Sequence, residues 1–146
     1  MKKKVLITMV IIWIIFIFFN SLQNAQVSAS QSGRVVGFLY DLFTKVGIDV
    51  DISTLSTWIR KLAHIFEYFI LALLITLIFF ETNLPISYKY IYSFAIPLLI
   101  AITDEYIQTM VPGRSGLVVD VLIDSIGITL GVVLLMIIRL FRKNKK

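Results

Sequence analysis

The sequence predicts an all-α membrane protein, a bundle of four transmembrane helices. Apolar residues make up 58% of the chain and charged residues only 16%, which is more apolar surface than a soluble domain of this length carries. Four apolar stretches are each about as long as the 20 residues that a helix needs to cross a bilayer. The two ends of the 146-residue chain are both basic, as expected for an even number of spans.

Composition also narrows the chemistry. The chain has no cysteine, so it has no disulfide framework, no thiolate zinc site and no thiol nucleophile. It has one histidine, His64, which argues against an imidazole-rich metal site. The net charge of +5 does not indicate a nucleic-acid partner, because membrane proteins collect basic residues on their cytoplasmic side.

The first predicted span covers about residues 5–22 and follows three lysines. A cleavable signal peptide is the alternative, since residues 27–29 loosely fit a small-residue cleavage site. A retained helix is favoured because the apolar run already fills the upper limit of a signal core. The Ser-, Gln- and Asn-rich residues 20–32 indicate a loop. Helical periodicity then predicts a short extracytoplasmic amphipathic helix over about residues 33–46, with Ser32 as its N-cap.

The other three spans are predicted at about residues 58–80, 90–110 and 117–138, which makes residues 1–146 one membrane domain. Val111 to Arg114 suits a type II turn, because Pro and Gly occupy its two central places. The third and fourth spans should therefore form an antiparallel hairpin. Gly127 and Gly131, four residues apart on one face of the fourth span, should let another helix backbone approach closely.

Charge predicts the orientation. With both termini in the cytoplasm, the inside holds nine cations and one acid, and the outside holds five cations and eight acids. The net charges are then +8 inside and −3 outside, which agrees with the rule that basic residues stay in the cytoplasm. The sequence therefore predicts a multi-pass protein of the cell membrane whose basic end contacts anionic lipid.

A set of eleven polar residues falls in the outer part of the second, third and fourth spans and in the turn. With a rise of about 1.5 Å per residue, His64, Asp104 and Asp124 each lie roughly 9–10 Å from their helix ends. Helical spacing also places Arg60, His64, Glu67 and Tyr68 on one face, and it puts Asp104 one turn from Gln108 and Asp120 one turn from Asp124. We therefore expect a pocket that opens outward, formed by Arg60, Lys61, His64, Glu67, Tyr68, Asp104, Glu105, Gln108, Arg114, Asp120 and Asp124.

Three motifs, well separated along the chain, resemble those of a known protein family. RKLAHIFEY at 60–68, DEYIQTMVPGR at 104–114 and DVLIDSIG at 120–127 resemble the VanZ-like membrane family, which is named for a teicoplanin-resistance protein. The resemblance implies a bacterial cell-envelope membrane protein with a role in reduced glycopeptide sensitivity, and it implies no settled reaction. Family members often carry His where this chain has Ile107, so a mechanism that needs a second imidazole is not expected here.

The pocket set holds five carboxylates and three cations, and this surplus leaves several functions open. One is a purely structural ion-pair network. Another is a binding site for a lipid head group, a lipid-linked cell-wall precursor or a glycopeptide. A third is a proton-coupled transporter, although no inverted repeat supports a carrier.

An enzyme acting on an outer-leaflet substrate is a further alternative. Its general base would be His64, oriented by Glu67 or Asp104, while two arginines would grip a phosphate. Ser115 is a weak candidate nucleophile, because serines are common in turns. In this hypothesis the catalytic residues are His64, Glu67, Asp104 and Glu105, and the substrate-binding residues are Arg60, Lys61, Tyr68, Gln108, Arg114, Asp120 and Asp124.

A divalent metal is also possible. His64 and Glu67 lie three residues apart on one helical face, and four acids of the third and fourth spans could complete an oxygen-rich shell: Asp104, Glu105, Asp120 and Asp124. Such a ligand set suits Mg²⁺, Mn²⁺ or Ca²⁺ better than a structural zinc ion. The sequence does not decide between a metal site, an enzyme and a binding protein.

Overall fold

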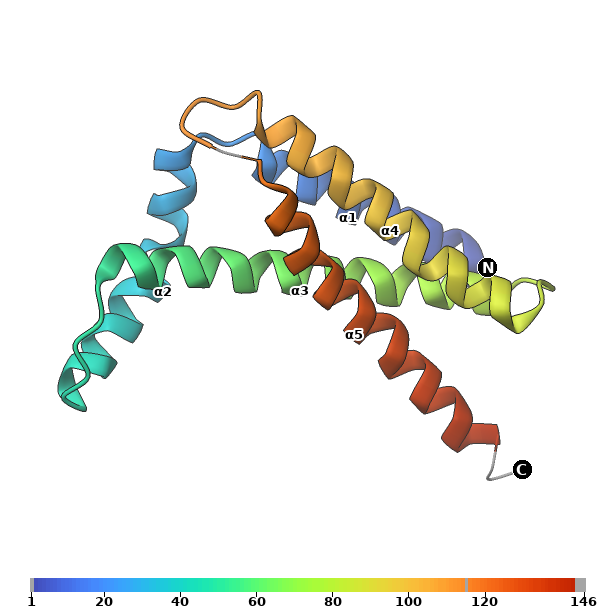
Figure 1. Cartoon of the computed structure of the whole chain (residues 1–146). Coiled ribbons are helices and arrows are strands. Elements are labelled where there is room, and N and C mark those ends of the chain that lie inside the picture. The colour runs from blue at the N-terminus through green and yellow to red at the C-terminus, as the bar shows by residue number, and fades with distance from the viewer. Residues whose placement is uncertain (1, 115, 144–146) are drawn as a thin grey trace.

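The computed structural model describes residues 2–114 and 116–143. Its described residues form five helices and no strand (Figure 1), so the predicted all-α class is confirmed. The helices are α1 (Lys2–Ser21), α2 (Ala25–Lys45), α3 (Ile52–Phe80), α4 (Ile86–Gln108) and α5 (Val118–Lys143).

Four of these helices are long and apolar enough to cross a membrane: α1, α3, α4 and α5. Their outer faces carry many exposed apolar side chains, such as Phe19 at 63%, Leu99 at 63% and Leu130 at 53% exposure. Large apolar side chains exposed on every spanning helix fit a surface that contacts lipid. The predicted number of spans is confirmed, and the chain is a multi-pass membrane protein.

The amphipathic helix is longer than predicted. It begins at Ala25, so the predicted loop over residues 20–32 is wrong except at 22–24. Ser32 lies inside α2 and is not its N-cap. The physical reason is that this stretch holds neither Pro nor Gly, and Ala, Gln and Ser enter a helix at little cost when tertiary contacts support it.

The second span also begins earlier than predicted, at Ile52, because Asp51 caps it. The Asp51 carboxylate accepts hydrogen bonds from the Ser53 hydroxyl and from the Thr54 backbone N–H, the latter at 2.9 Å. These bonds lower the pKa of Asp51 to about 2, since they favour its ionised form. The cap therefore determines that α3 begins at Ile52.

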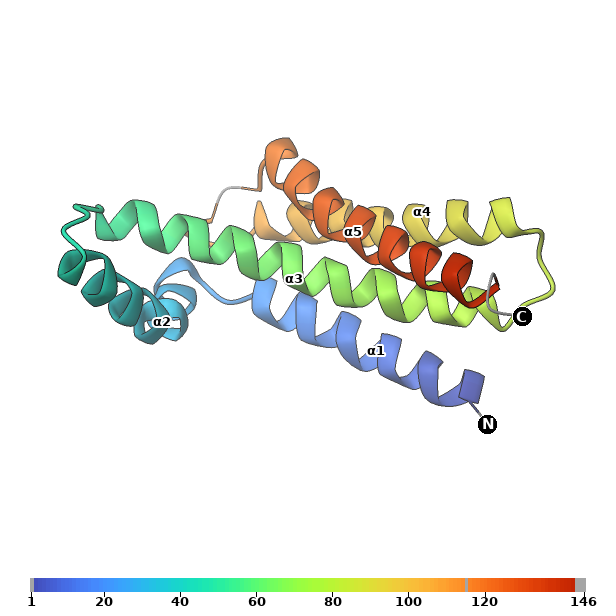
Figure 2. The ribbon, with the colours of Figure 1, turned by 90° about the horizontal axis from the view of Figure 1, so that it is seen from below.

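Helix α3 is the centre of the fold and packs against all four other helices. Figure 2 shows it between α1 on one side and α4 and α5 on the other. Its buried face supplies Tyr68, Leu71, Ala72 and Ile75 to a core. The other helices complete this core with Ile17, Ala101, Ile128 and Val132.

Helix α5 crosses α3 at the two glycines that the sequence singled out. A Cβ atom added to Gly127 would lie 2.1 Å from the Ile65 backbone oxygen, and one added to Gly131 would lie 2.7 Å from that of Phe69. Real Cβ atoms do not approach a backbone oxygen so closely, so only glycine permits this crossing. The predicted close approach of two helix backbones is confirmed.

The predicted turn between α4 and α5 is also confirmed. The Arg114 N–H donates to the Val111 carbonyl at 3.1 Å, and Gly113 has a φ of +78°, as the third position of a type II turn requires. Gly116 then passes directly over α4, because a Cβ there would lie 2.1 Å from the Glu105 carbonyl oxygen. This packing fixes the start of α5 beside the end of α4.

The bundle has two unlike ends (Figures 1 and 2). The start of α1, the connection between α3 and α4, and the end of α5 lie at one end. Helix α2 and the connection between α4 and α5 lie toward the other. We call the second the turn end, since the 111–114 turn lies there.

Candidate functional site

A small cavity of about 60 Å³ opens between α3, α4 and α5 at the turn end. Eight of the eleven predicted site residues line it: Arg60, Lys61, His64, Glu105, Gln108, Arg114, Asp120 and Asp124. The other three, Glu67, Tyr68 and Asp104, do not line the cavity, and Tyr68 and Asp104 are fully buried. Three helices and one turn thus bring polar groups together, although they are far apart along the chain.

Two arginines of the cavity wall lack carboxylate partners. Arg60 is exposed, and Arg114 donates from Nη1 to the Ser21 carbonyl at 3.2 Å while its buried Nε makes no hydrogen bond. Within residues 2–114 and 116–143, neither guanidinium has a carboxylate oxygen within 4.0 Å. Burial, and then the positive charge of Arg60, lower the pKa of Arg114. Two guanidinium groups therefore line the cavity, and neither is paired with a carboxylate of the described residues.

Lys61 differs from the arginines because it is paired. Its Nζ donates to Asp120 Oδ1 at 2.8 Å, and both side chains are 26% exposed. A partly exposed pair of this kind stabilises a protein by about 1 kcal/mol or less. The pair joins α3 to α5 at the cavity wall and leaves neither charge uncompensated.

The buried side of the site is acidic. Asp104, Glu105 and Asp124 are 0%, 5% and 1% exposed. Gln108 Nε2 lies 3.2 Å from both Asp104 Oδ2 and Glu105 Oε1, so one amide links the two carboxylates of α4. The Leu117 N–H donates to Glu105 Oε2 at 3.2 Å. Asp104 Oδ1 and both oxygens of Asp124 make no hydrogen bond with any described residue.

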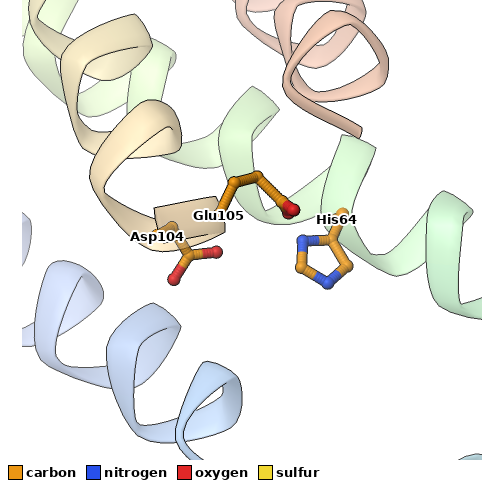
Figure 3. A group of neighbouring side chains, drawn as sticks. All are labelled: His64, Asp104 and Glu105. Atoms are coloured by element: carbon orange, nitrogen blue, oxygen red, sulfur yellow. The ribbon is translucent and has the colours of Figure 1, made fainter. Parts of the chain in front are cut away.

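His64 faces these carboxylates from α3. Its Nδ1 lies 3.7 Å from Asp124 Oδ1, which is too far for a hydrogen bond, and this nitrogen has no other partner among the described residues. Figure 3 shows His64 and Glu105 turned toward one another, with Asp104 on the far side of Glu105. One ligand atom from each of these three residues lies within 4.8 Å of the others.

The geometry changes two sequence-based interpretations. Glu67 accepts a hydrogen bond from Asn20 Nδ2 at 2.9 Å, so α1 engages the carboxylate that was expected to orient His64 or to bind a metal with it. Asp120 is committed to Lys61. The carboxylate that lies nearest to the imidazole is that of Asp124, which the sequence had placed among the substrate-binding residues.

Helix α1 supplies residues that the sequence analysis missed. Besides Asn20, Ser21 is 1% exposed and lies 3.4 Å from Gln108 Nε2 through its hydroxyl oxygen. Trp13 donates from its indole N–H to the Glu67 carbonyl at 2.9 Å. The sequence did contain a signal for these residues. The polar pair Asn20–Ser21 directly follows an apolar run of helical length, and such a pair indicates a helix end at the depth of the site.

A structural ion-pair network would need each buried carboxylate to meet a cation. Among the described residues the structure has the Lys61–Asp120 pair and the longer contact of His64 with Asp124. Asp104 and Glu105 have no ion-pair partner in this part of the chain. The arrangement therefore resembles an open polar site more than a closed network. Ser115, the weak nucleophile candidate, lies outside the described residues.

The motifs and the four spanning helices agree with one comparison with known proteins. Searches of curated proteins and of solved structures gave no significant match. A scan of family models matched residues 6–139 to the family described as VanZ/LLP1. Since this match covers nearly the whole chain, the chain belongs to the VanZ/LLP1 family.

Proposed function

We propose that this protein lies in the bacterial cell membrane with both termini in the cytoplasm and its cavity facing outward. There it binds the phosphate-bearing head group of an outer-leaflet lipid or a lipid-linked cell-wall precursor, and thereby lowers sensitivity to glycopeptides of the teicoplanin type. The family supports a membrane protein linked to glycopeptide resistance. The basic ends of α1 and α5, which lie at the same end of the bundle, support the orientation.

The pair Arg60 and Arg114 is the observation that carries this proposal. Both line the cavity, and neither has a carboxylate within 4.0 Å in the described part of the chain. Two guanidinium groups repel each other, so an anion bound between them relieves that repulsion. A planar guanidinium fits two phosphate oxygens at once, which makes arginine the preferred residue for binding phosphate.

The size of the cavity limits what enters it. A volume of about 60 Å³ holds a few water molecules, since each needs roughly 10–15 Å³ on this measure. A phosphate and its nearest substituent fit such a space, and a complete lipid-linked precursor does not. The rest of the ligand would therefore stay outside the cavity, against the helices or in the membrane.

A groove beside the cavity can hold the apolar part of such a ligand. It runs along α3 and α5 and is lined by Trp58, Val119 and Ile123 together with three hydroxyl-bearing residues of α3. Lys61 and Ile123 line both the groove and the cavity. This continuity of a polar cavity with an apolar groove favours a lipid over a free phosphate ion.

The test compares site variants in cells challenged with teicoplanin. Asp104→Asn, Glu105→Gln and Arg114→Ala should abolish the protection that the wild-type protein gives, while each variant still inserts and accumulates. For Arg114→Ala, the lost charged hydrogen bond to phosphate costs about 1.5–3 kcal/mol, or roughly 10–100-fold in affinity. The two amide variants test the acidic side of the same site. Arg34→Ala is the matched control, because Arg34 is exposed on α2 and does not line the cavity.

Full protection in all three site variants would refute the proposed site and make its polar residues structural. Mass spectrometry of lipids and wall precursors, with and without the protein, separates binding from catalysis. Binding predicts unchanged molecular species alongside retained protection. A new or depleted species would instead identify an enzyme acting at this site.

A further inference from the structure

Four groups that can bind a metal converge on the acidic side of the cavity. They come from three helices: His64 from α3, Asp104 and Glu105 from α4, and Asp124 from α5. The geometry points to a binding site for a divalent cation of the Mn²⁺ type, held by His64, Asp104 and Glu105 with Asp124 beside them. This inference does not depend on the proposed lipid ligand.

The distances between the candidate ligand atoms suit one ion. Atoms that lie about 2.1–2.5 Å from the same cation are roughly 3–5 Å apart from one another. One atom each from His64, Asp104 and Glu105 falls within 4.8 Å of the others, and Asp124 Oδ1 lies 3.7 Å from His64 Nδ1. Figure 3 shows the first three side chains around one space, so small side-chain rotations would complete the shell.

The acceptor atoms around this space lack partners although they are buried. Both oxygens of Asp124 and His64 Nδ1 are inaccessible to solvent and make no hydrogen bond with the described residues. Asp104 Oδ1 makes none of normal geometry either, although the buried Tyr68 hydroxyl lies beside this carboxylate. The two aspartates are 0% and 1% exposed. A buried carboxylate is costly unless it is paired or coordinates a metal. Water could supply hydrogen bonds to these atoms, but it supplies no positive charge.

The balance of charge also favours a cation when these carboxylates are ionised. Asp104, Glu105 and Asp124 contribute up to three negative charges when ionised. Lys61 is already paired with Asp120, so the cations of the cavity wall without a carboxylate partner among the described residues are Arg60 and Arg114. A divalent ion together with one of these arginines would balance three negative charges.

The donor set indicates which kind of ion fits. Three carboxylates form a hard, oxygen-rich site, which suits Mg²⁺, Ca²⁺ and Mn²⁺. The imidazole of His64 favours Mn²⁺ among these three, because nitrogen ligands suit transition metals better than they suit Mg²⁺ or Ca²⁺. A structural zinc site normally has four nitrogen or sulfur ligands, and these residues do not provide them.

Direct titration of the purified full chain with Mn²⁺ tests the site. The protein would be held in a phosphate-free maltoside detergent and freed of metal with EDTA, so that no lipid phosphate contributes. Electron paramagnetic resonance of free Mn²⁺ should then show about one ion bound per chain. Asp124→Asn and Glu105→Gln should each weaken binding roughly 10–100-fold, as changes around metal sites do.

Asp41→Asn is the matched control, because Asp41 is an exposed carboxylate on α2, outside the cluster, and Mn²⁺ affinity should not change. Circular dichroism and gel filtration would verify that each variant folds. Wild-type protein that leaves Mn²⁺ free, or folded site variants that bind as tightly as wild type, would overturn the inference. Loss of Mn²⁺ binding in Asp124→Asn with teicoplanin protection intact would separate this site from the proposed function.

Discussion

At the bundle end that holds the connection between α3 and α4, a buried charge is satisfied by the chain itself. Lys89 is only 7% exposed, and its Nζ donates to the Thr82 carbonyl at 2.6 Å. Arg139 lies over the Phe80 ring, with 4.5 Å from its guanidinium carbon to the ring centroid. At the turn end, by contrast, Asp104 and Asp124 are more deeply buried and keep oxygen atoms that make no hydrogen bond among the described residues.

The difference shows that burial alone does not mark a functional group. Both ends remove charged groups from solvent, which is costly unless a partner compensates. Lys89 donates to the carbonyl of Thr82 in the connection between α3 and α4, a local contact that stabilises the fold. At the turn end, Asp124 and Glu105 line a cavity instead, so the compensating partner can be a ligand.

The largest expected effect is in the accessibility of the two ends from outside the cell. Thr109→Cys, at the turn end, should react with a membrane-impermeant maleimide in intact cells, because the proposed topology places it outside. Asn83→Cys, in the connection between α3 and α4, should react only after lysis. The chain has no cysteine of its own, so each label reports one position. The reverse pattern would place the cavity in the cytoplasm.

The second-largest effect is expected for Gly127→Ala, which should disrupt the packing of α5 against α3 near the site. The new Cβ would lie 2.1 Å from the Ile65 backbone oxygen, so α5 must move away from α3 and carry Asp124 away from His64. Overpacking of this kind should lower the free energy of unfolding by about 3 kcal/mol and weaken teicoplanin protection. Thermal unfolding in detergent measures the first effect.

Gly37→Ala is the control for that substitution. Gly37 lies in α2, and an added Cβ there meets no atom within 4 Å, so stability should hold or rise by up to about 1 kcal/mol. Equal stability of the two variants would mean that the close crossing of α3 and α5 is not needed.

A smaller effect is expected at the opposite end. Lys89→Met keeps the apolar stem but removes the hydrogen bond to Thr82, which should lower the free energy of unfolding by about 1.5 kcal/mol. Teicoplanin protection per folded molecule should not change, because Lys89 does not line the cavity. Loss of protection in a stably accumulated Lys89→Met protein would contradict the contrast between the two ends.

Features with strong local signals could be predicted from the sequence. Apolar length identified the four spans, and Pro112–Gly113 identified the turn. Helical spacing placed His64, Asp104 and Asp124 at similar depths, and the structure brings them to one site. These predictions succeeded because helix rise and turn geometry are local properties of the chain.

Features that depend on contacts between helices could not be predicted. Asn20 and Ser21 join the site only because α1 packs beside α3 and α4. The same packing determines that Glu67 meets Asn20 and leaves Asp124 as the carboxylate beside His64. Helix α2 also begins earlier than helical periodicity alone predicted, because residues 25–32 contain neither Pro nor Gly to interrupt a helix.

The side-chain amide of Gln108 couples the site to the first helix. Its nitrogen carries two hydrogens, yet three acceptors lie within reach, namely Asp104, Glu105 and the Ser21 hydroxyl. With one hydrogen for each bond, the amide serves two of these three oxygens at a time. The end of α1 therefore competes with the two carboxylates of α4 for the same amide.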